Sequence, residues 1–377
     1  MRRTTRRLRG AAFLGLLGLL ACATPVEYHG RKVGGGFILW SVPGEISMGR
    51  EAIAELEAEG LPYLQEPTVQ ATLDRITNRL MAAVPPTFPK YPFNFAVIDD
   101  CVVNAFALPG GPIRIHRGLL VKTVETEAEL AGVLAHEMGH VLGRHGSKRV
   151  SDLFLKLGLL AAVVTVADEV ERGNCRSVNR DECQQTWSQV IGVVGYLGVV
   201  LSSLAYSRDN ENEADWIGTH LMIDAGYDPE GMARVFDKFA QMKAEKGVSE
   251  TAFLNRILST HPPSADRAVR VRQLRTERGA ARTDWALDTP AFARLRQDLR
   301  RLPPPAYEDA MTTLTCSAHR RTCGTRREEC YRRLLVCQRE ECDTIREQCV
   351  YIENECAKSE RECRAFEQAV RGRRPSC

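Results

Sequence analysis

The chain has almost no excess of charge of either sign. Its 51 lysine and arginine residues nearly balance 48 aspartate and glutamate residues, which leaves a formal net charge of +3. Proteins that bind nucleic acid normally concentrate positive charge, so we expect no nucleic-acid partner. With 44% hydrophobic and 26% charged residues, the 377-residue chain has the composition of a globular protein.

Long hydrophobic runs are also scarce. The first, Ala11–Ala21, is too short to anchor a chain across a bilayer. It follows an arginine-rich start and ends at Cys22, a pattern that resembles a bacterial lipoprotein signal. We predict a signal peptide over residues 1–21, acylation of Cys22, and a tether to the folded part over residues 22–43. A signal that is cleaved in the ordinary way, or not cleaved, is the alternative.

The residue after this cysteine bears on the location of the protein. Ala23 stands where an aspartate is typical of lipoproteins kept in the inner membrane. By resemblance to those sorting rules, the absence of the aspartate favours the outer membrane. We therefore expect a lipid-anchored protein on the periplasmic face of a bacterial cell envelope.

Two further apolar segments, residues 153–167 and 187–206, lie in the middle of the chain. The first is too short to span a bilayer, and the second is only just long enough. We predict that both pack on the folded domain or rest on the membrane surface; a membrane-spanning second segment is the alternative. Cys175 and Cys183, in the polar connection between them, could form one local disulfide bond.

Cysteine pairs two to four residues apart are absent, which argues against zinc knuckles. Export would expose the thiols to oxidation, and removing Cys22 from the 13 cysteines leaves an even number. Eight of these follow a seven-residue repeat with one five-residue step at its centre. They are Cys316, Cys323, Cys330, Cys337, Cys342, Cys349, Cys356 and Cys363.

This spacing is symmetric about residues 338–341, as expected of two antiparallel helices joined by a turn. Residues 312–370 would then form a hairpin that four disulfides hold together, because its arms carry little apolar surface. A parallel coiled coil with bonds between chains is the alternative. The predicted bonds, whose residue numbers all sum to 679, are Cys316–Cys363, Cys323–Cys356, Cys330–Cys349 and Cys337–Cys342. Cys101 and Cys377 are left, either free or paired, and residues 279–311 read as a proline-rich linker.

The string HEMGH at His136–His140 carries the most chemical information. Two histidines four residues apart lie on one face of a helix, so both imidazoles can reach one metal ion, with Glu137 held beside it. Residues 125–141 have acidic residues in their first turn and apolar residues at three- and four-residue steps, which predicts the helix that this geometry needs.

A second acidic string, SRDNENEAD at Ser207–Asp215, supplies the missing ligand type. A catalytic zinc site with two histidines needs a third protein ligand and an open position, and Glu211 on a neighbouring helix can provide the ligand. Asp215 lies one turn further on, where it can accept the ring N–H of a ligating histidine. Read alone, the string is much more typical of a solvated helix face, and only its occurrence together with HEMGH favours a metal ligand.

Several strings in order resemble the minigluzincin metallopeptidase family, which includes HtpX, the CAAX prenyl proteases and the periplasmic chaperone-protease BepA. They cover about residues 44–278, the predicted metallopeptidase domain. The C-terminal repeats of BepA have no counterpart here, so the protein partner of the cysteine hairpin stays unknown. The matching strings are NAFALPGG (104–111), HRGLL (116–120), HEMGHVLGRH (136–145), SRDNENEAD (207–215), AGYDPEGM (225–232) and STHPPSADR (259–267).

The resemblance implies one Zn²⁺ per chain, bound by His136, His140 and Glu211, with Asp215 behind them. Zinc activates water for attack on a peptide carbonyl, and Glu137 acts as the general base. His261 aligns with a loop histidine that in BepA-like relatives approaches the metal and restrains activity. His261 and Arg267 are also candidates for stabilising the oxyanion, or for plain loop residues.

Residues 104–115 read as two extended segments that turn at Pro109-Gly110-Gly111. Asn104, Ala105 and Phe106 could bind a substrate strand through their main chain; an ordinary hairpin is the alternative. Helical periodicity at residues 44–59 and 66–84, with a strand at 93–98, completes the expected fold. We predict an α+β class: a mainly helical HExxH zincin-like domain with a small antiparallel sheet, followed by the disulfide-laddered helical hairpin.

Together these features predict a lipid-anchored zinc endopeptidase that cuts misfolded or assembling envelope proteins. Its partners would be protein or peptide substrates and the membrane, through Cys22 and, where they rest on the membrane surface, through the segments 153–167 and 187–206. The alternative is an assembly factor or chaperone that retains the zinc fold but cuts little; a structural scaffold is a weaker one. Comparing protein turnover by the wild type and by Glu137→Gln would distinguish these readings.

Overall fold

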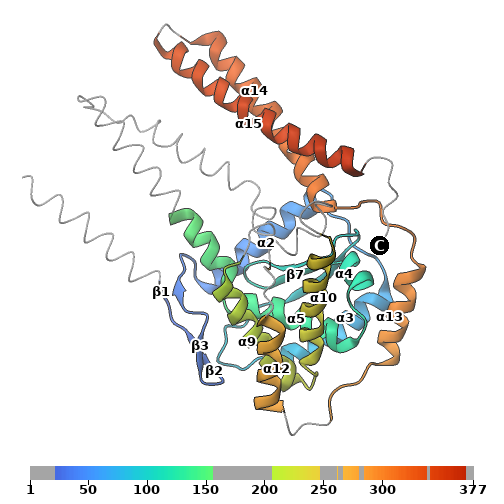
Figure 1. Ribbon diagram of the computed structural model, residues 1–377. Helices are drawn as coiled ribbons and strands as arrows, with labels where there is room; N and C mark the ends of the chain where they lie inside the picture. Colours follow the sequence, from blue (N-terminus) through green and yellow to red (C-terminus); the bar gives the residue numbers. More distant parts are fainter. Residues whose placement is uncertain are drawn as a thin grey trace, which may run out of the picture.

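The computed structural model describes residues 22–155, 206–246, 261, 266–279, 284–337 and 340–370. Helices pack around a small sheet, and a long helical hairpin projects away from this body (Figure 1). The fold is α+β with helices dominant, as predicted. The described elements are β1 (Cys22–Ala23), β2 (Val26–Tyr28), β3 (Arg31–Val33), β4 (Gly36–Phe37), α2 (Val42–Ala58), α3 (Pro67–Ala82), β5 (Asn94–Ile98), β6 (Ala105–Ala107), β7 (Pro112–His116), α4 (Arg117–Lys122), α5 (Glu127–Leu142), α9 (Arg208–Ala225), α10 (Glu230–Lys246), α12 (Asp266–Gly279), α13 (Pro290–Arg301), α14 (Ala310–Val336) and α15 (Glu340–Val370).

Helix α5 is buried along its whole length. The hydroxyl of Thr126 caps it by accepting the backbone N–H of Glu129, and acidic residues in the first turn complement the helix dipole. The helix ends at Leu142, one residue beyond the predicted end. Its continuous burial places the HEMGH string in the centre of the domain.

Helix α9 packs closely against α5. Ser207 caps its start by accepting the Asn210 N–H, and Gly226, with φ of +79°, ends it in the left-handed conformation. A Cβ atom at Gly139 would lie only 2.6 Å from the carbonyl oxygen of Ala214. Only glycine permits this approach, which brings the first turn of α9 to the two histidines of α5.

The larger sheet has three strands in the order β5-β7-β6 and is mixed, which corrects the expected antiparallel sheet. Strands β6 and β7 are antiparallel, as their short turn requires, whereas β5 is parallel to β7. The chain crosses from β5 to the far edge before it turns back into the centre, so the first and last strands share one direction. The spacing of the strands along the sequence did not reveal this crossover.

The expected tether at residues 22–43 is wrong for most of its length. Strands β2 and β3 pair with each other, as do β1 and β4. Tyr28 and Val33 are only 3% and 1% exposed and belong to the main hydrophobic core. The apolar side chains on one face of the β2–β3 pair outweigh the flexibility of the neighbouring glycines, so the segment packs on the domain.

The expected linker at residues 279–311 also contains structure. Helix α13 buries Phe292, Leu295 and Leu299 against the main core, where it packs on α3 and α4. Thr289 caps the helix and its hydroxyl donates to the carboxylate of Glu127 at 2.7 Å. The apolar residues have helical spacing, but the surrounding arginines and prolines masked the pattern.

Helices α14 and α15 form the antiparallel hairpin predicted from the cysteines. The structure places the four mirror-related cysteine pairs at disulfide distance within one chain, as the hairpin predicts. Sequence separations between bonded cysteines run from 47 at the base to 5 at the tip. The ladder therefore ties the two helices together along their length.

The base of the hairpin is packed on the peptidase body. Ala310, Met311 and Leu314 share a second hydrophobic cluster with Phe106 of strand β6. The backbone N–H of Ala310 donates to Asp100 at 3.0 Å, and the other carboxylate oxygen of Asp100 lies 2.7 Å from His116 at the end of β7. Asp100 thus connects the base of the hairpin to strand β7 of the sheet.

Several predictions fall outside the described residues. They concern the signal peptide at 1–21, most of the segments 153–167 and 187–206, the Cys175–Cys183 bond, and Cys377. Cys101 is disulfide-bonded. Within the described part of the chain, no helix has both the length and the apolar character needed to cross a membrane.

Candidate active site

Helix α5 directs the two histidines of the HEMGH string toward one point. The Nε2 atoms of His136 and His140 lie 3.1 Å apart, and both rings are almost fully buried. Two imidazole nitrogens can approach this closely when they share a proton or a cation. One turn of helix accounts for the arrangement, because residues four apart lie on the same face.

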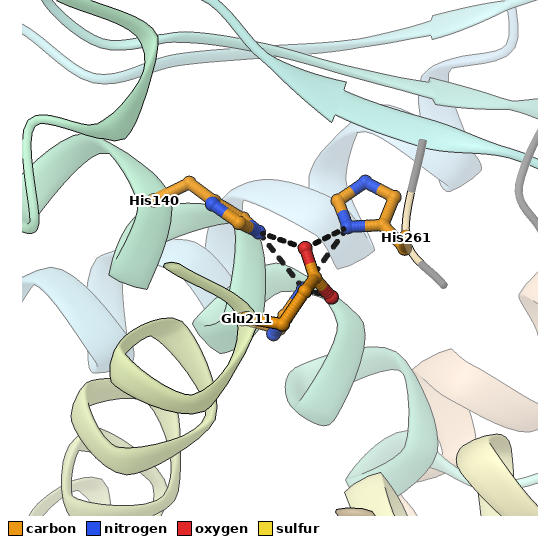
Figure 2. Close-up of side chains that lie close together, drawn as sticks. His140, Glu211 and His261 are labelled. Carbon is orange, nitrogen blue, oxygen red and sulfur yellow. Dashed lines mark hydrogen bonds and ion pairs between the residues drawn. The ribbon is translucent and has the colours of Figure 1, made fainter. Parts of the chain in front are cut away.

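The first turn of α9 brings Glu211 to the same point (Figure 2). Its Oε1 lies 3.2 Å from His140 Nε2, and its Oε2 lies 3.6 Å from His136 Nε2. His261 approaches from a separate segment, with Nδ1 at 3.0 Å from Glu211 Oε1 and 3.3 Å from His136 Nε2. The structure therefore brings together three expected ligands and the candidate regulatory histidine.

This cluster fits a tetrahedral zinc ion. Donor atoms of His136, His140, Glu211 and His261 all lie within 4.8 Å of one another. Zn–N and Zn–O bonds of about 2.0–2.1 Å place tetrahedral ligands roughly 3.3–3.4 Å apart, which agrees with contacts of 3.0–3.6 Å in the cluster. The donor set of imidazoles and carboxylate is also the one that zinc prefers.

The electrostatics of the cluster keep the donors in their metal-binding forms. Burial lowers the pKa of His140 well below its ordinary value, against the opposing effect of Glu211, so the imidazole stays neutral. Burial disfavours ionisation of Glu211, yet His261 and Arg267 hold its pKa well below the ordinary value. Neutral imidazole and ionised carboxylate are the forms that bind a cation.

Glu137 lies beside the cluster, and its pKa is shifted in the opposite direction to that of Glu211. Burial raises the pKa of Glu137, although His261 and His136 act in the opposite direction. Its Oε1 is 3.6 Å from His261 Nε2, while Glu137 Oε2 and His261 Nε2 are buried without a hydrogen-bond partner. Such atoms need a polar ligand, which a water molecule or substrate would supply.

Asp215 and Arg267 support the cluster from behind. Asp215 Oδ1 lies 3.0 Å from His136 Nδ1, the position expected of a carboxylate that orients a ligating histidine. The guanidinium of Arg267 binds both oxygens of Asp215 at 2.8 Å, and its Nη1 lies 2.7 Å from Glu211. It also lies over the ring of Phe236. These contacts occupy most of its donors, which favours a clamp on α9 over a free donor to an oxyanion.

Strand β6 forms the edge of the sheet nearest to this cluster. Ala105 lines an apolar pocket with His136, Glu137, Val133 and Phe236. The neighbouring Phe106 packs into the second hydrophobic cluster instead. The amide group of Asn104 is buried, with neither its oxygen nor its nitrogen hydrogen-bonded.

Sequence reasoning missed three residues at the site. Tyr206 is buried and stacks on the His140 ring with centroids 3.8 Å apart. His145 lies 2.9 Å from His140, and Glu213 lies 3.2 Å from His145. All three lie in or next to the strings HEMGHVLGRH and SRDNENEAD, but no helical spacing connects them to a ligand.

The sequence comparisons point to one family. The chain matches the profile of peptidase family M48 over residues 67–275. It is 27% identical over 228 residues to the beta-barrel assembly-enhancing protease of Yersinia pestis, covering 59% of this chain and 42% of that protein. It is 32% identical over 181 residues to metalloprotease LoiP of Escherichia coli (strain K12), and the alignment covers 48% of this chain and 62% of that protein. It is 29% identical over 174 residues to mitochondrial metalloendopeptidase OMA1 of Arabidopsis thaliana, and the alignment covers 46% of this chain and 29% of that protein.

These relatives are only partly aligned. The chain spans about two fifths of the length of the beta-barrel assembly-enhancing proteases that it matches. The matched region nevertheless includes α5, α9 and His261, and thus every residue of the cluster. Because the family profile covers more than half of the sequence, the chain belongs to peptidase family M48.

Proposed function

We propose that the chain is a zinc-dependent endopeptidase that hydrolyses peptide bonds of misfolded or assembling proteins in the bacterial envelope. The observation that carries the proposal is the convergence of donor atoms from His136, His140 and Glu211 beside the carboxylate of Glu137. Two imidazoles and one carboxylate form a standard catalytic zinc site, and a separate carboxylate suits general acid–base catalysis.

In this proposal His136, His140 and Glu211 hold one zinc ion per chain. When bound, zinc lowers the pKa of a water molecule and polarises the substrate carbonyl. Glu137 accepts the proton as the water attacks and returns it to the departing amine. The raised pKa of this buried carboxyl supports the role, because a group that both accepts and donates works best when its pKa approaches neutrality.

The substrate would bind along strand β6. An edge strand has unpaired main-chain groups that can take an extended peptide as an additional strand. Ala105 lies in the pocket beside His136 and Glu137, which supports this placement of the scissile bond. Asn104 adds a buried amide with unused hydrogen-bonding groups at the start of the strand.

The names of the relatives support an envelope location. A beta-barrel assembly-enhancing protease is among the matches, and the predicted acylation of Cys22 would place this chain on the periplasmic face of the outer membrane. The hairpin is proposed to bind a protein partner. Large hydrophobic side chains exposed near its tip support that role: Tyr331, Leu335, Val336, Val350 and Tyr351.

A second function, an assembly factor or chaperone with little proteolysis, is favoured by the position of His261. With its Nδ1 in the donor cluster, four protein donors surround the metal position, whereas a catalytic zinc keeps one position open.

We therefore propose that the resting protein is latent and that His261 must withdraw before a substrate can bind.

Replacing Glu211 with alanine tests the proposal. We expect the variant to lose its zinc and to show no more hydrolysis of an unfolded protein than the chelator-treated wild type, because two histidines alone bind the metal weakly. Metal content is measured by atomic emission and hydrolysis by release of labelled peptides. Asp209→Ala, an exposed acid in the same helical turn, should behave as the wild type. Zinc-independent hydrolysis by wild type and variant alike would reject the proposal.

Replacing His261 with alanine tests the latent state. We expect faster hydrolysis with zinc content unchanged, because the variant frees one position of the cluster while His136, His140 and Glu211 remain. The comparison uses initial rates on the same labelled protein, and His220→Ala serves as the matched control since His220 is a buried histidine of α9 outside the cluster. An unchanged or lower rate for His261→Ala would contradict latency.

A further inference from the structure

We propose that His145 and Glu213 are positioning residues for the metal ligand His140, and that they link the two ligand-bearing helices α5 and α9. The inference rests on the proposed function, since it takes His140 as a zinc ligand. It concerns the ring nitrogen of His140 that faces away from the metal position. Asp215 performs the corresponding task for His136 through a direct contact of 3.0 Å.

The chain turns sharply after the end of α5, and this turn brings the side chain of His145 into contact with that of His140. Gly143 caps the helix, and a Cβ atom there would lie 2.4 Å from His145 Nε2. Arg144 then adopts φ of +57°, a left-handed conformation that costs free energy for any residue other than glycine. Its guanidinium holds this conformation through Glu45, with Nε at 2.8 Å, and through the carbonyl of Trp40 at 3.1 Å.

The bend places Nδ1 of His145 2.9 Å from Nδ1 of His140. A neutral histidine that binds metal through Nε2 carries its proton on Nδ1, so His140 must donate to His145. Nδ1 of His145 is then an acceptor, and its proton lies on Nε2. That nitrogen is 3.2 Å from Oε2 of Glu213, which accepts the bond. The direction of every bond in the chain follows from metal binding at His140.

Glu213 joins this chain to two other parts of the molecule. It lies on α9, two residues after the ligand Glu211, so one carboxylate connects the second helix to the first. Its Oε1 accepts the backbone N–H of Gly34 at 2.6 Å, and Lys148 lies 3.6 Å from Oε2. Gly34, between strands β3 and β4, is thus hydrogen-bonded to the carboxylate that supports His145 and, through it, His140.

Zinc affinity distinguishes a positioning role from simple packing. Carboxylates or other groups that orient a ligating histidine typically change metal affinity by 10–100-fold when removed. A residue that only fills space would change the stability of the metal-free protein without changing affinity in the molecules that remain folded. Asparagine at position 145 separates the two roles further, because its amide oxygen can accept the His140 N–H while its volume is smaller.

The experiment measures zinc affinity of the full chain by competition with a chelating dye, for wild type, His145→Leu, His145→Asn, Glu213→Gln and His220→Leu. We expect affinity to fall about 10–100-fold for His145→Leu, to recover most of that loss in His145→Asn, and to fall less in Glu213→Gln, which keeps an acceptor. The visible spectrum of the cobalt-substituted protein should change in His145→Leu. His220→Leu, the buried control, should keep the affinity of the wild type.

Affinity and cobalt spectrum equal to the wild type in folded His145→Leu and Glu213→Gln would overturn the inference. Should His145→Leu fail to fold, Glu213→Gln decides the question, because glutamine keeps the shape of glutamate but removes its charge: a measurable fall in zinc affinity supports the inference, and an affinity equal to the wild type overturns it. Failure of the proposed function looks different: the wild type would bind zinc with the same dependence on His145 but would hydrolyse no protein.

Discussion

Hydrolysis by the Glu137→Gln protein should be about two to four orders of magnitude slower than by the wild type, with zinc content unchanged. Glutamine has nearly the shape of glutamate but cannot accept a proton. The measurement compares initial rates on an unfolded envelope protein, with metal analysis of both samples.

The control for this variant is Glu125→Gln. Glu125 lies just before α5 and its side chain is 62% exposed, so its charge is not part of the buried cluster. The control should keep the rate of the wild type. Equal rates for Glu137→Gln and the wild type, with zinc retained, would instead support the assembly-factor reading, in which the zinc fold binds partners without general-base chemistry.

Replacing Arg267 with methionine should destabilise the metal-free protein by about 3–5 kcal/mol. The substitution removes the clamp between α12 and α9 and leaves the carboxylates of Asp215 and Glu211 without their cation. Burial opposes ionisation of both groups, yet Arg267 lowers the pKa of Asp215, and His261 together with Arg267 lowers the pKa of Glu211. The free energy of unfolding is measured in urea with a chelator present, and added zinc should recover part of the loss.

Arg272→Met provides a matched comparison on the same helix. Its guanidinium contacts Glu230 and Asp237, but the side chain is 40% exposed. Solvent screening limits such a pair to about 0–1 kcal/mol. If the two variants unfold at the same urea concentration, the buried cluster does not depend on Arg267, and its role as a clamp is wrong.

Features set by local geometry could be predicted from the sequence. The spacing of His136 and His140 defines one helix face, and Gly226 at the end of α9 is the residue type that most often ends a helix. The cysteine ladder could be predicted because mirror-symmetric spacing leaves one arrangement for an antiparallel hairpin, from Cys316–Cys363 to Cys337–Cys342. In each case the spacing of residues within a short stretch of sequence determines which side chains lie close together or where a helix ends.

Features set by distant contacts could not be predicted. The parallel direction of β5 depends on a crossover, and the folding of Tyr28 and Val33 onto the core depends on a surface that the domain supplies. His145 lies five residues after His140, which on a continuous helix would place the two on different faces. The left-handed turn at Arg144, held by Glu45 from another helix, brings them together.

In Figure 1 the cysteine hairpin projects from the body of the molecule, and residues at its base contact that body. One carboxylate oxygen of Asp100 accepts the backbone N–H of Ala310 at the start of α14, and the other lies 2.7 Å from His116 Nδ1. Apolar residues at the base of the hairpin pack with Phe106 of strand β6. The arm and the proposed substrate strand therefore share one hydrophobic cluster.

The most direct test of the account is the anomalous diffraction of a zinc-loaded crystal, recorded on both sides of the zinc absorption edge. We predict one strong peak per chain, within about 2.0–2.2 Å of His136 Nε2, His140 Nε2 and a carboxylate oxygen of Glu211. The absence of a peak there, or a peak bound by other side chains with Glu211 remote from it, would contradict the assignment of the catalytic site.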